Sequence, residues 1–141
     1  NDVTDDLRSE IIAKTASEFS SRKEVRAALF SIQRNFYDGS GLVADGRDMG
    51  TVVFNDAKLK VFLTASPEER AKRRYLELQN RGQEVNMREL IDDIKKRDLK
   101  DSSRELSPLF PAEDAHIIDS SNLSLEEVFS ITENLIKKEF N

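Results

Sequence analysis

The sequence has 141 residues, a net charge of -5 at pH 7 and no cysteine. This length suffices for one domain with a sizeable core. The composition excludes disulfide bonds and thiolate chemistry, and no run approaches the roughly 18 apolar residues of a membrane span. The acidic balance argues against a general nucleic-acid coat protein, while its clustered arginines suit a small anionic ligand. We therefore expect a cytoplasmic protein, without a signal peptide, that binds neither nucleic acid nor membrane.

Helical periodicity dominates the first third of the chain. Apolar residues of segment 5–19 recur at helical spacing and predict a helix. Ser21 followed by Glu24 predicts a capping box at the start of a second helix. "DGSG" at 38–41 predicts a turn, and "LVAD" at 42–45 predicts a strand buried on both faces, as in a parallel sheet.

Strand and helix signals alternate after this point. "KLKVFLTA" at 58–65 predicts a strand, and "SPEER" at 66–70 predicts a capped helix start with proline in the first turn. Gly82 ends that helix, and the cap at 86–89 begins another that runs to about Arg104.

The last elements indicate the fold class. "AHIIDSS" at 115–121 predicts a third strand, and the capping box at 124–127 begins a final helix. Alternation of this kind predicts an α/β fold with a parallel sheet. Three strands make an unusually small sheet, so we expect residues 1–141 to be one partial domain, the later part of a larger one.

The first candidate site is "ADGRD" at 44–48, which follows the predicted strand 42–45. Ligands of open α/β sheets bind at the carboxyl ends of strands. Asp45 suits a hydrated Mg²⁺, Arg47 offers a planar fork for phosphate, and Asp48 accepts from an amino group. The alternative is a plain strand-to-loop turn with local pairing.

The second candidate is "RDLKDSSR", in which Arg97, Asp101 and Arg104 stand at i, i+4 and i+7. On a helix they continue the stripe of Leu90 and Ile94, so an apolar stripe becomes ionic partway along. A solvated charge ladder is the alternative.

The third candidate is "ERAKRRYLELQNRG" at 69–82, whose crowded arginines and terminal glycine suit a mobile lid over phosphates. A basic solvated helix face is the alternative. Together the three clusters offer the positive groups that phosphoryl transfer needs. The phosphate-cradling pattern GxxxxGK[ST] is missing from these residues.

The stretch "GLVADGRDMGTVVFNDAKLKVFLTASPEERAKRR", with "RDLKDSSRELSPL" and "IIDSSNLSLEEV", resembles the bacterial cytidylate kinases. The resemblance extends from about Val3 to the last helix and covers roughly the C-terminal three-fifths of such an enzyme. It implies a P-loop kinase fold, with residues 1–18 ending the nucleoside-monophosphate-binding insertion and the helix after it, and 72–88 forming the approximate lid.

The resemblance also implies an activity and its partners. Family members transfer the γ-phosphoryl group of ATP, with Mg²⁺, to CMP or dCMP. We expect a monomer with no metal site of its own, and we expect the isolated 141 residues to be inactive because the phosphate-binding loop is missing. Asn55 departs from the family's usual proline, but asparagine also suits a turn.

Site residues carry over by motif. The resemblance implies that each contacts substrate or the transferred phosphoryl group: Ser17, Arg26 and Asp48 the cytosine, Arg47 the CMP phosphate, Arg97 and Asp101 the ribose, Arg104 and Arg73 the phosphoryl group, and Asp45 the metal region. Cytosine presents an N4 donor that a carboxylate accepts, which agrees with the placement of Asp48.

Two alternatives stay open. In the first, the chain is a catalytically incompetent CMP-binding fragment, as the missing GxxxxGK[ST] favours. In the second, it is a helical interaction module whose arginines lie on the surface.

Overall fold

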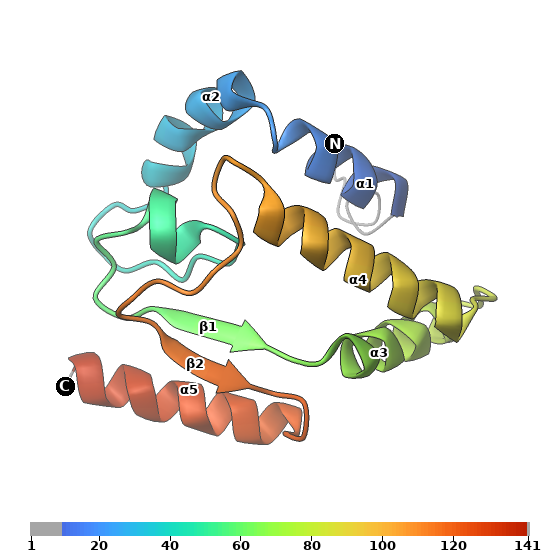
Figure 1. Cartoon of the computed structure of the whole chain (residues 1–141). Helices are drawn as coiled ribbons and strands as arrows, with labels where there is room; N and C mark the ends of the chain where they lie inside the picture. Colours follow the sequence, from blue (N-terminus) through green and yellow to red (C-terminus); the bar gives the residue numbers. More distant parts are fainter. Residues whose placement is uncertain (1–9, 141) are drawn as a thin grey trace.

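The chain folds as two parallel strands flanked by helices, and the computed structural model describes residues 10–140 (Figure 1). Residues 1–9 of the predicted segment 1–18 lie outside the described residues. In chain order the elements are α1 (Glu10–Phe19), α2 (Lys23–Arg34), the π-helical turn η2 (Met49–Val53), β1 (Val61–Thr64), α3 (Pro67–Asn80), α4 (Met87–Ser103), β2 (His116–Asp119) and α5 (Leu125–Phe140). The predicted α/β class with a parallel sheet is confirmed.

The sheet pairs β1 with β2 in parallel, so that Val61 lies opposite His116 and Thr64 opposite Asp119. Two further backbone bonds, from His116 to the Lys60 carbonyl (2.9 Å) and from Ser120 to the Thr64 carbonyl (2.8 Å), extend the ladder by one step at each end. Helix α5 runs along one side of this pair (Figure 1). Both strands are shorter than the apolar runs that predicted them.

The strand predicted at 42–45 does not form, and the prediction of three strands is wrong for the described residues. Residues 41–45 take no regular structure, and Val43 is 94% exposed. A strand is stable only when a neighbour satisfies its N–H and C=O groups. Among residues 10–140 the β1–β2 pair is the whole sheet, so this apolar run has no ladder to join.

Three of the four predicted helix caps are confirmed. The Ser66 hydroxyl accepts from the N–H of Glu69, and the Asn86 side chain accepts from the N–H groups of Arg88 and Glu89. Ser124 forms the full reciprocal box at the start of α5. The box predicted at Ser21 is wrong. Helix α2 begins one residue later, with Arg22 at the N-cap, and the Ser21 hydroxyl donates back to a carbonyl of α1.

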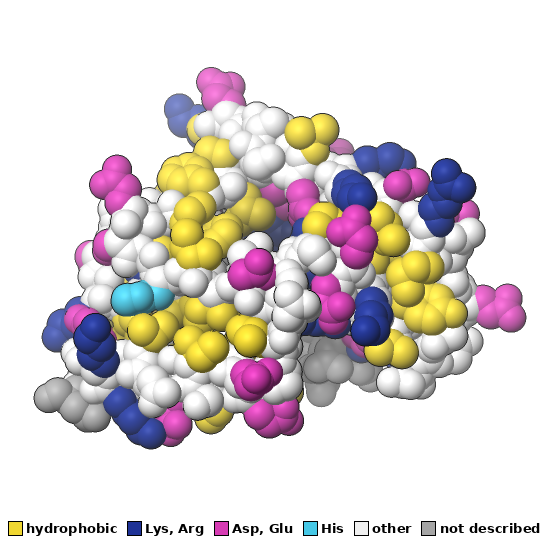
Figure 2. Space-filling model, turned by 60° about the horizontal axis from the view of Figure 1, so that its bottom comes forward, with side chains coloured by type: hydrophobic (Ala, Val, Ile, Leu, Met, Phe, Trp, Pro, Cys, Tyr) yellow, Lys and Arg dark blue, Asp and Glu magenta, His cyan; other side chains and the backbone are white. Residues whose placement is uncertain are grey.

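Few apolar side chains of the described residues are fully buried; they are Val53, Ala71, Leu78 and Ile118. Apolar side chains are exposed in groups on the face shown in Figure 2, and the strand residue Ile117 is 63% exposed. No helix among residues 10–140 is both long and apolar enough to cross a membrane.

Helices α3 and α4 pack side by side beyond the end of β1 (Figure 1). Ala71 and Leu78 of α3 are buried. The guanidinium of Arg70 forks onto the carboxylate of Asp98 in α4, and its Nε donates to the Ala65 carbonyl (3.1 Å). This one side chain therefore joins the end of β1 to both helices.

The Arg70–Asp98 pair predicts how stability depends on pH. Hydrogen bonding from Arg70 lowers the pKa of Asp98 below its ordinary value. A carboxyl whose folded-state pKa is lowered contributes stability that is complete above its unfolded pKa and is lost as pH falls through its folded pKa. Asp98→Asn should therefore reduce the acid-induced loss of unfolding free energy below about pH 4, measured by urea titration at several pH values.

Asp93→Asn is the matched control, because Asp93 is exposed and lies 3.9 Å from Lys96. An Asp98→Asn variant that keeps the wild-type pH dependence would show that Arg70 does not stabilise the folded state through this carboxylate.

Candidate functional site

A cavity of about 570 Å³ lies between the N-terminal helices, the segment 45–53 and the C-terminal end of α4. This volume is within the range of about 300–1,000 Å³ that small-molecule sites occupy. Eight of the nine residues implied by the resemblance line it: Ser17, Arg26, Asp45, Arg47, Asp48, Arg97, Asp101 and Arg104. Segments far apart in the sequence thus contribute to one site.

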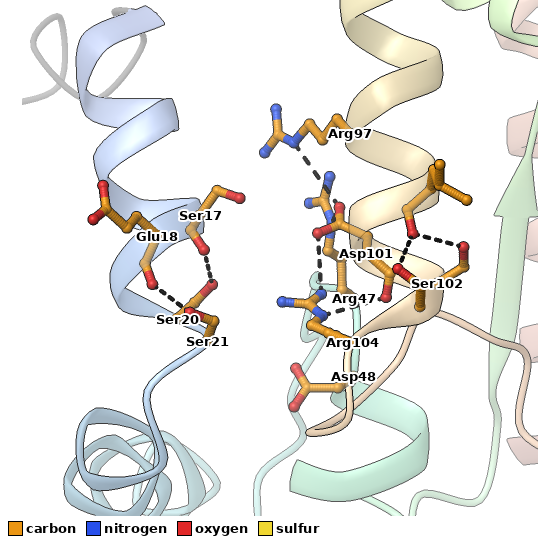
Figure 3. A network of polar contacts seen from close by, with 12 residues as sticks. Ser17, Glu18, Ser20, Ser21, Arg47, Asp48, Arg97, Asp101, Ser102 and Arg104 are labelled. Carbon is orange, nitrogen blue, oxygen red and sulfur yellow. Dashed lines mark hydrogen bonds and ion pairs between the residues drawn. The ribbon is translucent and has the colours of Figure 1, made fainter.

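Asp101 is the centre of the positive part of the cavity. It is 2% exposed and accepts from Nε of Arg47, while Nη2 of Arg104 lies 3.3 Å and Nε of Arg97 3.9 Å from its carboxylate oxygens. Figure 3 shows the three guanidinium groups around this carboxylate. One negative charge faces three positive charges, so the cluster keeps a positive excess that suits an anion.

The helical register explains the cluster. Arg97 and Asp101 are four residues apart in α4, and Arg104 is the C-cap residue, so all three lie along one stripe as predicted. Arg47 comes from the loop before η2 and crosses to this stripe. The ionic stripe is therefore not a solvated ladder, because Asp101 is buried and a distant segment joins it.

A second ion pair joins Arg26 of α2 to Asp48 on another wall of the cavity. Asp48 is 8% exposed, and Arg26 also donates to the Ser20 carbonyl (3.1 Å). Burial lowers the pKa of the Arg26 guanidinium, and the positive charge of Arg104 lowers this pKa further. The Arg26–Asp48 pair and the Asp101 cluster are thus close enough to influence each other.

Ser17 and Asp45 line the same cavity without joining either ion-pair group. Ser17 lies on α1, across an open space from Arg97 and Asp101 (Figure 3). Asp45 is exposed at the end of the segment that was expected to form a strand. Both residues therefore belong to the cavity wall outside the two ion-pair groups.

Arg73 lies elsewhere. Its guanidinium donates to the carbonyl (2.6 Å) and hydroxyl (3.2 Å) of Ser120, just beyond β2, and it lies 3.4 Å from Glu69. The structure therefore uses Arg73 to join α3 to the end of β2, outside the cavity described above.

The sequence did not single out several other residues that line the cavity. Val53 is 3% exposed in η2, a π-helical turn for which no local pattern was recognised. Ser107 takes a left-handed conformation (φ 49°) in the loop after α4. Non-glycine residues rarely adopt this conformation, and those that do are concentrated at functional sites. The sequence around Ser107 does not predict the left-handed conformation.

The site offers recognition groups rather than a metal cage. Within residues 10–140, no three carboxylate or histidine side chains gather closely enough to hold a metal ion. The cavity instead presents arginine donors for an anion at one wall, and a buried carboxylate beside an arginine at another. This combination suits a ligand that carries both a phosphate and an amino-bearing ring.

The family profile described as cytidylate kinase matches residues 1–138 of this chain. The chain is 54% identical over 127 residues to the cytidylate kinase of Stutzerimonas stutzeri and 54% identical over 127 residues to that of Caldicellulosiruptor saccharolyticus. It is 50% identical over 137 residues to the cytidylate kinase of Photorhabdus laumondii.

The three alignments cover 90%, 90% and 97% of this chain, respectively. The chain spans 56% of the length of the first two relatives and 60% of the third.

Replacing the central carboxylate tests the cluster. Asp101→Asn leaves three arginines without their shared anion, and we expect a loss of about 1–3 kcal/mol in unfolding free energy. The loss is below that of a fully buried pair because Arg47 and Arg97 remain nearly half exposed. Inorganic phosphate should raise the melting temperature of this variant more than that of the wild type.

Sodium chloride at equal ionic strength controls for screening, and Asp93→Asn controls for the loss of an exposed acid. Equal stabilisation of wild type and Asp101→Asn by phosphate would contradict the view that the arginines form one anion site.

Proposed function

Because the chain belongs to the cytidylate kinase family, we propose that it forms the phosphate-acceptor side of a kinase that transfers the γ-phosphoryl group of ATP to CMP or dCMP. The products are CDP or dCDP. The parallel strands flanked by helices are consistent with a partial P-loop kinase-type domain.

The observation that carries the proposal is the convergence of Arg47, Arg97 and Arg104 on one buried carboxylate in a ligand-sized cavity. Phosphoryl transfer requires little covalent chemistry from the protein and depends on positioning and on positive charge around the phosphates. A positive wall built by distant segments meets this requirement.

The Arg26–Asp48 pair supplies recognition of the base. Cytosine presents an N4 amino donor beside the N3 and O2 acceptors, so Asp48 accepts from N4 while Arg26 donates to the ring. Uracil presents a carbonyl where cytosine has the amino group, and this carbonyl would oppose the Asp48 carboxylate. Ser17, on the facing helix, completes the base-side set.

The Asp101 cluster supplies recognition of the sugar and phosphate. The Asp101 carboxylate accepts from a ribose hydroxyl with Arg97 beside it, and the Arg47 fork binds the CMP phosphate. Arg104, 13% exposed at its side chain, faces the phosphoryl group in transit. On binding, the ligand replaces part of the protein's internal ion pairing.

The ATP side draws on fewer of these residues. Mg²⁺ is commonly held by one or two carboxylates together with substrate phosphates, and the exposed Asp45 at the cavity wall suits such a role. Magnesium, when bound, neutralises phosphate charge. Arg73 serves as the lid arginine in this proposal, which requires it to exchange its bonds with Ser120 for a phosphate.

A second candidate is a CMP-binding unit that does not itself use ATP. The sequence contains no GxxxxGK[ST] cradle, and this observation favours the second candidate for the 141 residues by themselves. Both candidates share the CMP site and differ only in the use of ATP.

Isothermal titration of the chain tests both candidates. We expect CMP to bind weakly and ATP to bind no more tightly. Arg47→Ala should weaken CMP binding about tenfold while leaving cytidine binding unchanged, because Arg47 meets only the phosphate. Lys137→Ala, which removes a cation paired with Glu133 on α5, is the control. Tight ATP binding would contradict the inference from the missing cradle.

Asp48→Ala tests base recognition. Loss of the N4 acceptor should reduce the preference for CMP over UMP by about 5- to 100-fold, the effect of one good base contact. The measurement is the ratio of the two dissociation constants. A ratio equal to that of the wild type would place cytosine elsewhere.

A further inference from the structure

Arg34, in the last turn of α2, binds residues 53–56 at the end of η2 through both terminal nitrogens of its guanidinium. Nη1 donates to Oδ1 of Asp56 (2.6 Å) and to the Val53 carbonyl (3.2 Å), and Nη2 donates to Oδ2 of Asp56 (3.0 Å). The guanidinium also lies over the ring of Phe54, 5.1 Å from its centre. A two-pronged arginine–carboxylate pair with a third bond and a ring contact fixes orientation as well as distance.

This clamp, the Arg34–Asp56 pair, repeats the Arg26–Asp48 pair farther along the same two segments. The arginines are eight residues apart on α2, a little over two turns, and their acids are also eight residues apart. Helix α2 is therefore braced against the segment 48–56 at two points, and α2 and η2 are in contact.

The two pairs differ in exposure and in place. Arg26 and Asp48 line the cavity, and their side chains are 22% and 11% exposed. The side chains of Arg34 and Asp56 are 34% and 63% exposed, and neither residue lines the cavity. Val53 connects the two regions, because its buried side chain lines the cavity while its carbonyl accepts from Arg34.

This inference rests on the proposed function, in which the Arg26–Asp48 pair, the inner of the two pairs, has to open for a base to bind. The bond that Arg26 donates to Asp48 occupies the donor and the acceptor that cytosine would use. Once the Arg26–Asp48 pair opens, the Arg34–Asp56 clamp still fixes the distance from α2 to η2. We propose that the Arg34–Asp56 clamp is a positioning pair that sets the width of the slot between Arg26 and Asp48, and thereby the selectivity for cytosine.

The clamp persists at neutral pH. Hydrogen bonding from Arg34 lowers the pKa of Asp56, and the same bond raises the pKa of Arg34. Both groups therefore stay charged when the base-side pair exchanges partners. Neither clamp side chain touches the base, so their effect is one of geometry.

The test compares Arg34→Lys, Arg34→Gln and Asp56→Asn by their dissociation constants for CMP and UMP. We expect each variant to lower the CMP-over-UMP preference about fivefold, because a loosened slot no longer holds Asp48 at the N4 position. Arg34→Lys keeps the charge but not the fork, so it should restore stability better than selectivity. A merely structural role would weaken both nucleotides equally and leave the ratio unchanged.

Asp93→Asn is the matched control, because Asp93 is 75% exposed at its side chain and its partner Lys96 (3.9 Å) lies on the same helix, α4. An unchanged ratio in Arg34→Lys and Asp56→Asn overturns the proposal, as does an equal fall in Asp93→Asn. Should Arg34→Gln fail to fold, Asp56→Asn decides. Equal affinity of the wild type for CMP and UMP would instead contradict the proposed function itself.

Discussion

The site depends on a buried carboxylate that is shared by three arginines. Asp101 sits at 2% exposure, and without it Arg47, Arg97 and Arg104 would repel one another across a low-dielectric wall. Its backbone carbonyl also accepts from Leu109 (2.8 Å), so the same residue fixes the loop that follows α4. One position thus sets the charge of the cavity and the course of the chain around it.

Internal ion pairs occupy the bonding positions that a nucleotide would use. The Arg26–Asp48 pair and the Asp101 cluster satisfy their own charges, which avoids the cost of leaving a charge buried and unpaired. A ligand that replaces these bonds must match both donors and acceptors, or it leaves one of them unpaired. Replacing internal ion pairs in this way favours selectivity over affinity. A base with the wrong donors and acceptors would leave buried groups unpaired, and their desolvation would weaken its binding.

Short sequence patterns predicted the helix starts whose caps are formed by residues close together in the chain. The caps at Ser66, Asn86 and Ser124 are satisfied by the next few residues, so each could be inferred from its own segment. Ser21 has the same spacing, but an N-cap depends on where the preceding helix ends. Helix α1 runs to Phe19, and the Ser21 hydroxyl donates back to the Glu18 carbonyl of that helix. The N-cap of α2 is therefore Arg22, one residue later.

Nonlocal features account for what the sequence could not predict. The run at 42–45 has strand composition, but a strand needs a hydrogen-bonded neighbour, and composition does not say which segment supplies it. The stripe of Arg97, Asp101 and Arg104 was predictable from helical spacing. The contact of Arg47 with Asp101, 54 residues away, and the placement of Arg73 on Ser120 were predicted by no sequence signal.

The two walls of the cavity differ in how firmly they are held. The α4 wall is fixed by the contact of α4 with α3, by the Arg70–Asp98 fork and by the buried Asp101. The α2 wall contains no buried residue, and two arginine pairs link it to the residues on either side of η2. Under the proposed function, a nucleotide that opens the Arg26–Asp48 pair would therefore meet a fixed phosphate side and a base side whose position depends on Arg34. In the proposed function, selectivity for the base consequently rests on a contact outside the cavity, whereas retention of an anion rests on the buried carboxylate within it.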